Sequence, residues 1–209
     1  MFAGHVGAAL IVKKAAPGVG LGKLVAAALL LDTLLGMFVL AGLESVRVPD
    51  DFARLHFLRF DFPVSHGLLA TVSWSLIALA IVRNKWGIEA GNAVGLAVFS
   101  HWPLDAIEHE PELPLALGSP AVGLSLWHVL PLAIALEAAL VAAGLFAYWP
   151  LASGRRRTGV TIAACATVAL SATQLFATEP PSVRAEAVSW MLAAPLFGAL
   201  FGWLDQERR

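Results

Sequence analysis

The sequence predicts an all-α integral membrane protein, a bundle of about six transmembrane helices preceded by a short amino-terminal helix. Of its 209 residues, 58% are hydrophobic and 14% are charged, and the mean hydropathy is +0.75, which is too apolar for a soluble domain. The apolar residues fall into runs long enough to span a bilayer. Because no repeat or soluble segment interrupts these runs, residues 1–209 are expected to form a single transmembrane domain.

The chain opens with an apolar run at residues 2–12 that is too short to span a bilayer unaided. A signal sequence carries its basic residues before the apolar run, whereas Lys13 and Lys14 follow this one. We therefore expect the segment to be retained as a short helix.

Six later runs are predicted to span the membrane, namely 22–43, 64–82, 88–107, 121–148, 158–177 and 186–204. Residues 44–63 mix arginines and acids with large apolar side chains, which is typical of an interfacial segment lying on the membrane. Residues 1–148 carry every histidine and are expected to hold the site. Residues 158–204 would supply two supporting helices.

A candidate metal site lies where the 88–107 run ends. His101, Asp105 and His109 are each four residues from the next, so on a helix their side chains form one stripe that turns by only about 40° per step. Imidazole and carboxylate groups are the usual ligands of zinc, manganese and iron. Ionisable residues in an apolar run are costly, which favours a divalent metal site over a polar helix end that faces water.

Four more ionisable residues, His5, Asp32, His66 and His128, lie on other predicted helices. Lysine and arginine gather on one side of the predicted spans, which makes that side cytoplasmic. At a rise of 1.5 Å per residue, Asp32 lies roughly 13 Å from this side, and the histidines lie between the midplane and the outer leaflet. This shared depth predicts that the groups converge toward the outer leaflet.

The order of these residues resembles a known group of proteins. It reads Gly4-His5, then Asp32, then Ser65-His66, then Ser100-His101 with Asp105 four residues later. This order resembles the small bacterial proteins called LexA-regulated, membrane-bound metal-dependent hydrolases. Segments 100–105, 109–115 and 180–185 also resemble an uncharacterised bacterial inner-membrane group. The resemblance implies a multi-pass protein of the bacterial inner membrane.

The same order is similar to the all-α superfamily of zinc-dependent phospholipase C and P1 nuclease, whose members bind up to three zinc ions. This similarity implies a first metal held by Asp32, His66, His101 and Asp105, with zinc as the expected ion. It implies that Asp105 bridges to a second metal bound by His5, and that His109 and His128 bind a third. The chain departs from the superfamily at Leu132, where a carboxylate is expected, and it lacks the amino-terminal tryptophan.

The implied activity is a metal-dependent hydrolase, by resemblance a phosphoesterase that acts on a lipid or lipid-linked substrate. A metal-activated water would attack phosphorus, and Asp32 or Asp105 would position the ligands or accept a proton. Arg54 and Arg59 either form a solvated face or bind a phosphate above the site. The net charge of −1 does not indicate nucleic-acid binding. The bilayer is an expected partner, and an oligomer or a membrane-complex partner stays open.

Three alternatives use the same residues. A metal or proton transporter would need polar residues that continue to the cytoplasmic side, and these stop near the midplane. A b-type cytochrome would need facing histidines without nearby carboxylates. A non-catalytic membrane subunit is consistent with Leu132. His56 is interpreted as a surface residue and Glu137 as a packing or oligomer contact. The single cysteine, Cys165, excludes a disulfide framework.

Overall fold

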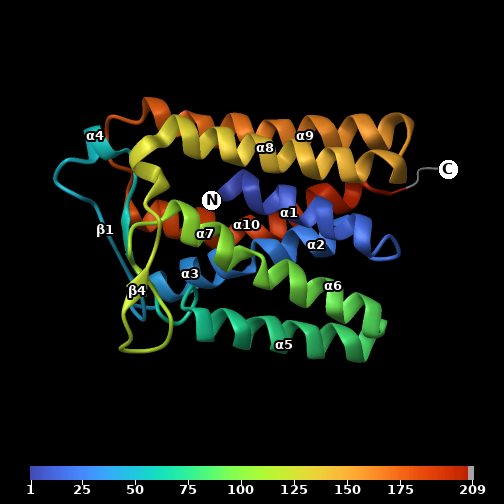
Figure 1. Cartoon of the computed structure of the whole chain (residues 1–209), viewed down its shortest axis with the longest axis horizontal. Helices are drawn as coiled ribbons and strands as arrows, with labels where there is room; N and C mark the ends of the chain where they lie inside the picture. The colour runs from blue at the N-terminus through green and yellow to red at the C-terminus, as the bar shows by residue number, and fades with distance from the viewer. Residues whose placement is uncertain (207–209) are drawn as a thin grey trace.

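The computed structural model describes residues 1–206, and most of them are helical (Figure 1). Four helical stretches are long and apolar enough to cross a membrane: α5 (Leu68–Trp86); η1, α8 and η2 (Leu126–Leu151, with α8 at Leu130–Tyr148); α9 and η3 (Gly154–Phe176, with α9 at Gly154–Ala172); and α10 (Val183–Leu204). A fifth is possible if α2 (Leu21–Ala28) and α3 (Leu30–Leu40), bent by 46°, form one broken span. The expected count of about six is not confirmed.

The predicted span 88–107 folds as two short helices, α6 (Ile88–Phe99) and α7 (His101–Glu108), neither of which is long enough to cross a bilayer. The break at Ser100 lies three residues before Pro103. Proline clashes with the carbonyl four residues earlier and lacks an N–H, so it is best tolerated where Pro103 stands, in the first turn of a new helix. The break sets α7 apart from α6, with His101 as the first residue of α7.

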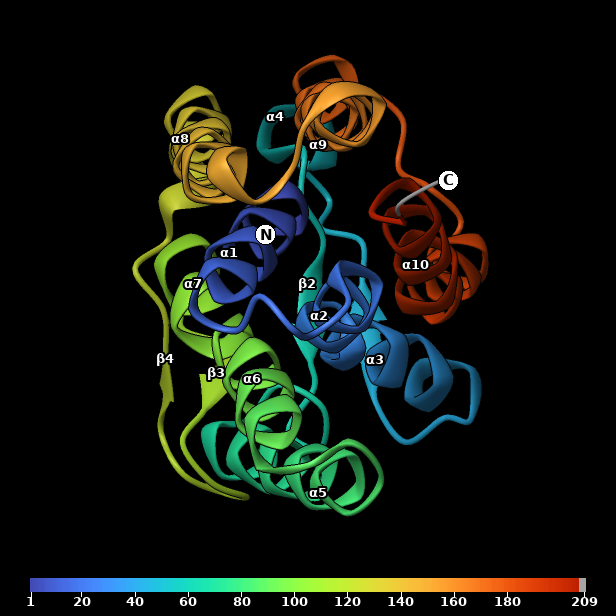
Figure 2. The same ribbon diagram turned by 90° about the vertical axis from the view of Figure 1, so that its right-hand side faces the viewer.

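Helix α1 (Phe2–Ala15) lies in the middle of the bundle, between α8 and α9 on one side and α2, α6 and α7 on the other (Figure 2). Most of its residues are buried, which explains why its sequence is apolar on all sides. Gly7 and Gly144 allow the close approach of α1 to α8. A Cβ on Gly7 would lie 2.6 Å from the backbone of Leu140, and one on Gly144 would lie 2.5 Å from Gly7 O.

The interfacial segment predicted at 44–63 folds as a small cap on one end of the bundle. Strands β1 (Ser45–Arg47) and β2 (Arg59–Asp61) pair antiparallel, with the short helix α4 (Phe52–Leu55) between them. A second ribbon, β3 (Leu113–Pro114) with β4 (Ala121–Val122), joins the cap. The buried side chains of Phe52, Leu55 and Phe62 hold this cap against the helices.

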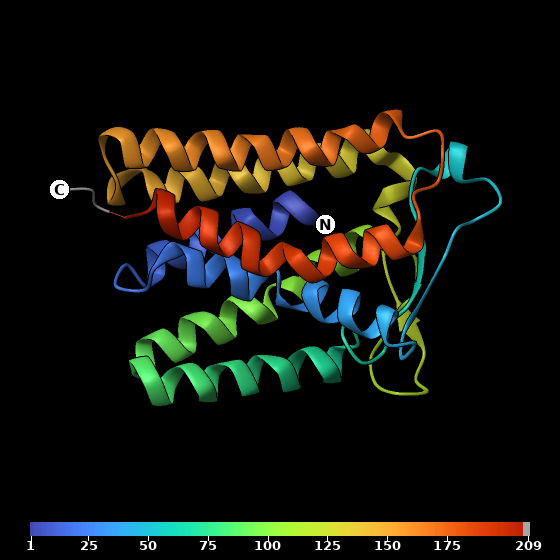
Figure 3. The same ribbon diagram turned by 180° about the vertical axis from the view of Figure 1, so that it is seen from behind.

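Most of the basic residues gather at the opposite end of the bundle from the cap. They lie at the α1–α2 connection, at the end of α5 and at the start of α9, which meet at that end (Figures 1 and 3). Within residues 1–206, the exceptions are Arg47, Arg54 and Arg59 in the cap and Arg184 at the start of α10. The acidic residues Glu108, Glu110 and Glu112 lie at the cap end. The bundle is therefore polarised along its length, as the positions of lysine and arginine in the sequence predict.

Candidate metal centre

His101 and Asp105 stand one turn apart on α7 and face the same buried point. The Nε2 atom of His101 is 3.1 Å from Asp105 Oδ2, and neither side chain is exposed by more than 2%. The other ring nitrogen, Nδ1, lies 2.7 Å from the carbonyl oxygen of Ala28, the last residue of α2. A carbonyl oxygen only accepts hydrogen bonds, so Nδ1 carries a proton, and in the neutral ring Nε2 presents a lone pair.

His66 lies in the turn before α5 and points toward the same place, and its ring is held by a hydrogen-bond chain that runs from Glu44 through Ser65 Oγ. The Glu44 carboxylate accepts bonds from the backbone N–H groups of Val64 and Ser65 at 2.8 Å, and from Ser65 Oγ at 2.7 Å. Because Ser65 Oγ donates to Glu44, it accepts from His66 Nδ1 at 2.8 Å. His66 Nε2 therefore also presents a lone pair. Burial raises the pKa of the Glu44 carboxyl, against the hydrogen bonds from Ser65 and Val64.

Asp32 completes this first group. It lies in the first turn of α3, directly after the bend at Leu29. Its Oδ1 atom is 3.8 Å from His66 Nε2 and 3.7 Å from His101 Nε2. One ligand atom from each of Asp32, His66 and His101 lies within 4.8 Å of the others. The side chain of Asp32 keeps 22% of its surface exposed, whereas the two imidazoles are buried.

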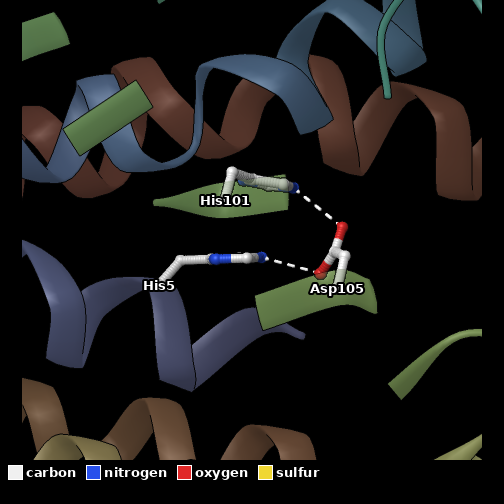
Figure 4. Close-up of side chains that lie close together, drawn as sticks. All are labelled: His5, His101 and Asp105. Carbon is white, nitrogen blue, oxygen red and sulfur yellow. Dashed lines mark ion pairs between the residues drawn. The ribbon is translucent and has the colours of Figure 1, made fainter. Parts of the chain in front are cut away.

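His5 and Asp105 form a second group with His101 (Figure 4). The rings of His5 and His101 stack, with centroids 3.6 Å apart, and both point their Nε2 atoms at the Asp105 carboxylate. His5 Nε2 is 3.2 Å from Asp105 Oδ1, but neither nitrogen of this fully buried ring makes a hydrogen bond within the part of the chain described. A buried imidazole without hydrogen bonds is costly unless another group binds it.

These groups fit a divalent metal ion. The Nε2 atoms of His66 and His101 are 3.1 Å apart. When both rings are neutral their lone pairs repel each other, and either a metal ion between them or a proton on one Nε2 atom removes the repulsion. Nitrogen ligands about 2.0–2.1 Å from one zinc ion in a tetrahedral site lie about 3.3 Å apart. The serine–carboxylate chain behind His66 and the carbonyl behind His101 are the supporting contacts that metal-binding histidines usually have. The site is therefore able to hold a metal ion, and its geometry leaves the identity of the metal open.

The structure places two further groups here that sequence reasoning missed. The amino group of Met1 lies 3.0 Å from Asp105 Oδ1 and 3.4 Å from Glu108 Oε2. Glu108 also accepts a hydrogen bond of 2.9 Å from Trp127 Nε1, and its other oxygen has no partner among the described residues. The sequence signal for Glu108 was its position three residues after Asp105, which puts both on one face of α7. A backbone amino group leaves no comparable signal.

His109 lies beside the cluster, although it is not part of the predicted helical stripe. Helix α7 ends at Glu108 and His109 is extended, consistent with Pro111 two residues later. Its Nε2 atom still comes within 3.8 Å of Asp105 Oδ2, while Nδ1 lies 2.7 Å from Glu112 Oε1. The Glu112 carboxylate therefore orients this imidazole toward Asp105.

His128 and the two arginines lie outside the cluster. The side chain of His128 is 42% exposed, and its Nε2 atom lies 2.8 Å from Glu110 Oε1. Arg59 binds the other oxygen of Glu110 at 2.9 Å, and Arg54 pairs with Asp51 on the surface. Burial raises the pKa of Glu110, but the hydrogen bonds from His128 and Arg59 outweigh it and lower that pKa overall. His128 is engaged in a surface network, apart from the residues grouped around His101, and its role as a ligand of a third metal stays a prediction from the resemblance.

A cavity of about 540 Å³ borders the cluster. Asp32, His66, Asp105 and His109 contribute to its wall, whereas His5 and His101 lie behind it. Aromatic side chains of the cap and of the helices form much of the rest: Phe52, Phe57, Phe60, Phe62, Trp127, Trp190 and Phe197. A ligand in this cavity would therefore meet the carboxylates and imidazoles on one part of its surface and apolar rings on the remainder.

Glu137 contacts the start of α1 and holds it next to the cluster. This carboxylate is only 4% exposed. It accepts hydrogen bonds from the backbone N–H groups of Ala3 and Gly4 and from Ser171 Oγ. It therefore satisfies two of the free N–H groups at the beginning of α1. The contact lies within the chain, in agreement with a packing role.

Comparison of the chain with models of protein families, with curated proteins and with solved structures found no match. The resemblance to the membrane-bound hydrolases and to the zinc-dependent superfamily stays a prediction from the sequence. The functional argument therefore depends on the geometry of the cluster and of the cavity beside it.

Proposed function

We propose that this chain is a metal-dependent hydrolase embedded in the bacterial inner membrane, a phosphoesterase that acts on a lipid or lipid-linked substrate. The observation that carries the proposal is the pair of facing Nε2 atoms of His66 and His101, 3.1 Å apart beside the carboxylates of Asp32 and Asp105. This arrangement stands at the wall of a large, mainly apolar cavity. A hydrolytic centre needs both a ligand set and space for a substrate.

Zinc is the proposed metal, because imidazole and carboxylate ligands in a compact set favour it. When bound, such an ion lowers the pKa of water and neutralises negative charge on a phosphoryl oxygen. Asp32 is the carboxylate better placed to accept a proton from that water, because it lines the cavity and keeps 22% of its side chain exposed. Asp105 is buried against His101 and His5, which suits it to hold ligands in place.

A transport function is less well supported. Helices α1, α2 and α6 lead from the cluster to the basic end of the bundle. Apart from Lys13, which pairs with Asp205 at the basic end, the buried side chains on that route are apolar: Val6, Ala9, Leu10, Leu21, Leu24, Val25, Val94 and Ala97. An ion or proton path would need polar groups there.

The activity can be tested on the purified protein in nanodiscs, after metal analysis and an absorption spectrum to detect zinc or haem. We expect about one or more zinc ions per chain and metal-dependent release of a phosphorylated product from phospholipid vesicles. We expect Asp32→Asn to retain metal and to lose most of this release. A protein that contains no metal, or one that contains metal and releases no product from any phospholipid, would contradict the hydrolase proposal.

We propose that the cap and the cluster face the outer leaflet and that the basic end is cytoplasmic. Cysteine labelling tests this orientation in a Cys165→Ala background, because the native cysteine is exposed. A membrane-impermeant reagent applied to intact spheroplasts is expected to label Leu117→Cys in the cap, where the native side chain is 76% exposed, and not Ser153→Cys before α9. Labelling of position 153 alone would reverse the orientation.

A further inference from the structure

The cavity beside the cluster extends between α9 and α10, two of the helices that are able to cross a membrane. On the α9 side it is lined by Leu170, Ser171, Thr173 and Gln174. On the α10 side it is lined by Glu186, Ser189, Trp190, Ala193 and Phe197. The α10 residues recur every three or four positions, so one face of this helix follows the cavity. The two helices stand apart in the end-on view (Figure 2).

The cavity is open on this side. Leu170 lines it and is also 52% exposed, and Ser189 and Gln174 are exposed as well. In a bilayer the outer surfaces of α9 and α10 face acyl chains. An opening between two such helices therefore admits molecules that are already in the membrane, without passage through the cap.

Polar and apolar groups are separated along this opening. Gln174, Glu186 and Ser189 lie toward the ends of α9 and α10 that are near the cap. Ala193 and Phe197 lie one and two turns deeper on α10, and the ring of Phe197 packs at 5.0 Å against Phe2. A lipid would match this order, with its headgroup beside the cluster and its acyl chain along the deeper apolar part.

The charges of the lining residues select the headgroup. Six carboxylates contribute to the wall, namely Asp32, Asp105, Glu108, Glu137, Glu179 and Glu186, and no lysine or arginine does. The Met1 amino group also lies at the wall, but it pairs with Asp105 and Glu108 and leaves Glu179 and Glu186 at the rim unpaired. Glu186 bonds to Ser189, and neither it nor Glu179 forms an ion pair with any residue described in the structure. An anionic headgroup would meet unbalanced negative charge at this rim, whereas an ammonium group would be attracted.

We propose that the gap between α9 and α10 is a lateral portal that binds one phospholipid with a zwitterionic, amine-bearing headgroup. Its phosphate would face the His/Asp cluster, and its ammonium would lie near the Glu186 carboxylate and the Trp190 ring. The inference rests on the proposed function for the reaction that follows. The occupancy of the portal, however, depends only on the shape and charge of the cavity.

Native mass spectrometry tests the portal on the full chain, after incubation with vesicles of dioleoyl phosphatidylethanolamine or dioleoyl phosphatidylglycerol and extraction in mild detergent. We expect one tightly held phosphatidylethanolamine on the wild-type protein and at least tenfold less phosphatidylglycerol. Ala193→Trp fills the cavity and should reduce occupancy at least tenfold. Ser189→Trp acts at the exposed mouth, where folding is least disturbed, and should do the same. Leu196→Trp is the control, because Leu196 is 60% exposed and does not line the cavity.

A separate substitution tests which headgroup the portal prefers. Glu186→Gln should keep a bound phospholipid and should reduce the preference for phosphatidylethanolamine severalfold. Equal lipid occupancy in wild type and Ser189→Trp, or none in wild type, would overturn the portal. Equal binding of the two lipids by wild type would overturn the headgroup assignment. Metal content and product release are measured in the same preparations, so lipid occupancy without hydrolysis would contradict the proposed function and leave the portal standing.

Discussion

The Nε2 atoms of His66 and His101 face each other at 3.1 Å, although the contacts of both rings place the proton on Nδ1. When both rings are neutral, two buried lone pairs at this distance repel each other. A shared cation removes the repulsion and turns the pair into two ligands. This relationship is the physical basis for expecting that metal binding contributes to the stability of the bundle.

The first prediction is that His101→Ala loses the metal, while His56→Ala keeps it. His101 belongs to both ligand groups, so its removal leaves each with fewer ligands than zinc usually needs. His56 lies in the cap and bonds through Nδ1 to Ala177 O, outside the cluster. Metal-to-protein ratios by elemental analysis decide the matter. Equal ratios in both variants and wild type would show that the metal is bound elsewhere.

The second prediction concerns the hydrogen-bond chain behind His66. Ser65→Ala leaves His66 Nδ1 without its acceptor and frees the ring to adopt the wrong tautomer, so metal affinity should fall by about 10–100-fold. Glu44→Gln should weaken affinity by a similar or smaller factor. Ser65→Thr keeps the hydroxyl and should preserve most of the affinity.

Ser75→Ala is the matched control for that series, because Ser75 is also buried and bonds only to the backbone of its own helix. Competition with a chromogenic zinc chelator measures all four affinities. If Ser75→Ala weakens binding as much as Ser65→Ala, the effect is general loss of packing, and the positioning role of Ser65 is wrong.

The third prediction is that Glu137→Ala destabilises the protein. It leaves the N–H groups of Ala3 and Gly4 buried without acceptors, which costs about 1–3 kcal/mol for each group left unsatisfied. Glu89→Ala, on the exposed first turn of α6, should cost about 1 kcal/mol or less. Thermal unfolding in nanodiscs compares the two. A Tm for Glu137→Ala as high as that of Glu89→Ala would show that water replaces the lost acceptor.

Hydropathy located the long helices well, because runs of about twenty apolar residues have few other uses. Hydropathy could not locate the two helix breaks, between α6 and α7 and between α2 and α3. Whether Pro103 kinks one helix or begins another depends on what packs around the bend, and the same holds for Leu29 between α2 and α3. The position of α1 in the middle of the bundle could also not be predicted from the sequence. A short apolar helix is compatible with several positions until its neighbours are known.

The candidate site was likewise predicted only in part from the sequence. The order of Asp32, His66, His101 and Asp105 in the chain singled them out, and the structure brings them together. The groups that support these ligands could not be predicted from the sequence. Glu44 contacts Ser65, and the Met1 amino group contacts Asp105, and both pairs are far apart in the chain. Spacing alone also does not reveal that Glu110 binds His128 on the surface, away from the cluster.

The last prediction concerns the α1–α8 contact at Gly7. In isolation, alanine favours a helix over glycine by about 1 kcal/mol, so helix propensity predicts that Gly7→Ala stabilises the protein. The added Cβ would lie 2.6 Å from the Leu140 carbonyl and 2.8 Å from Val141 N, which are backbone atoms that no side-chain rotation can move away. The two helices must separate, and we expect a net loss of about 1–3 kcal/mol.

His5 stands half a turn before Gly7, so displacement of α1 should also move its imidazole away from Asp105, now 3.2 Å away, and reduce the metal content. Gly20→Ala is the matched control: a Cβ there meets no atom within 4 Å, so both Tm and metal content should stay near the wild-type values. Unfolding and metal analysis on the same samples test both effects. A higher Tm for Gly7→Ala, with full metal content, would mean that α1 does not pack against α8 as closely as described, and the position of His5 would have to be revised.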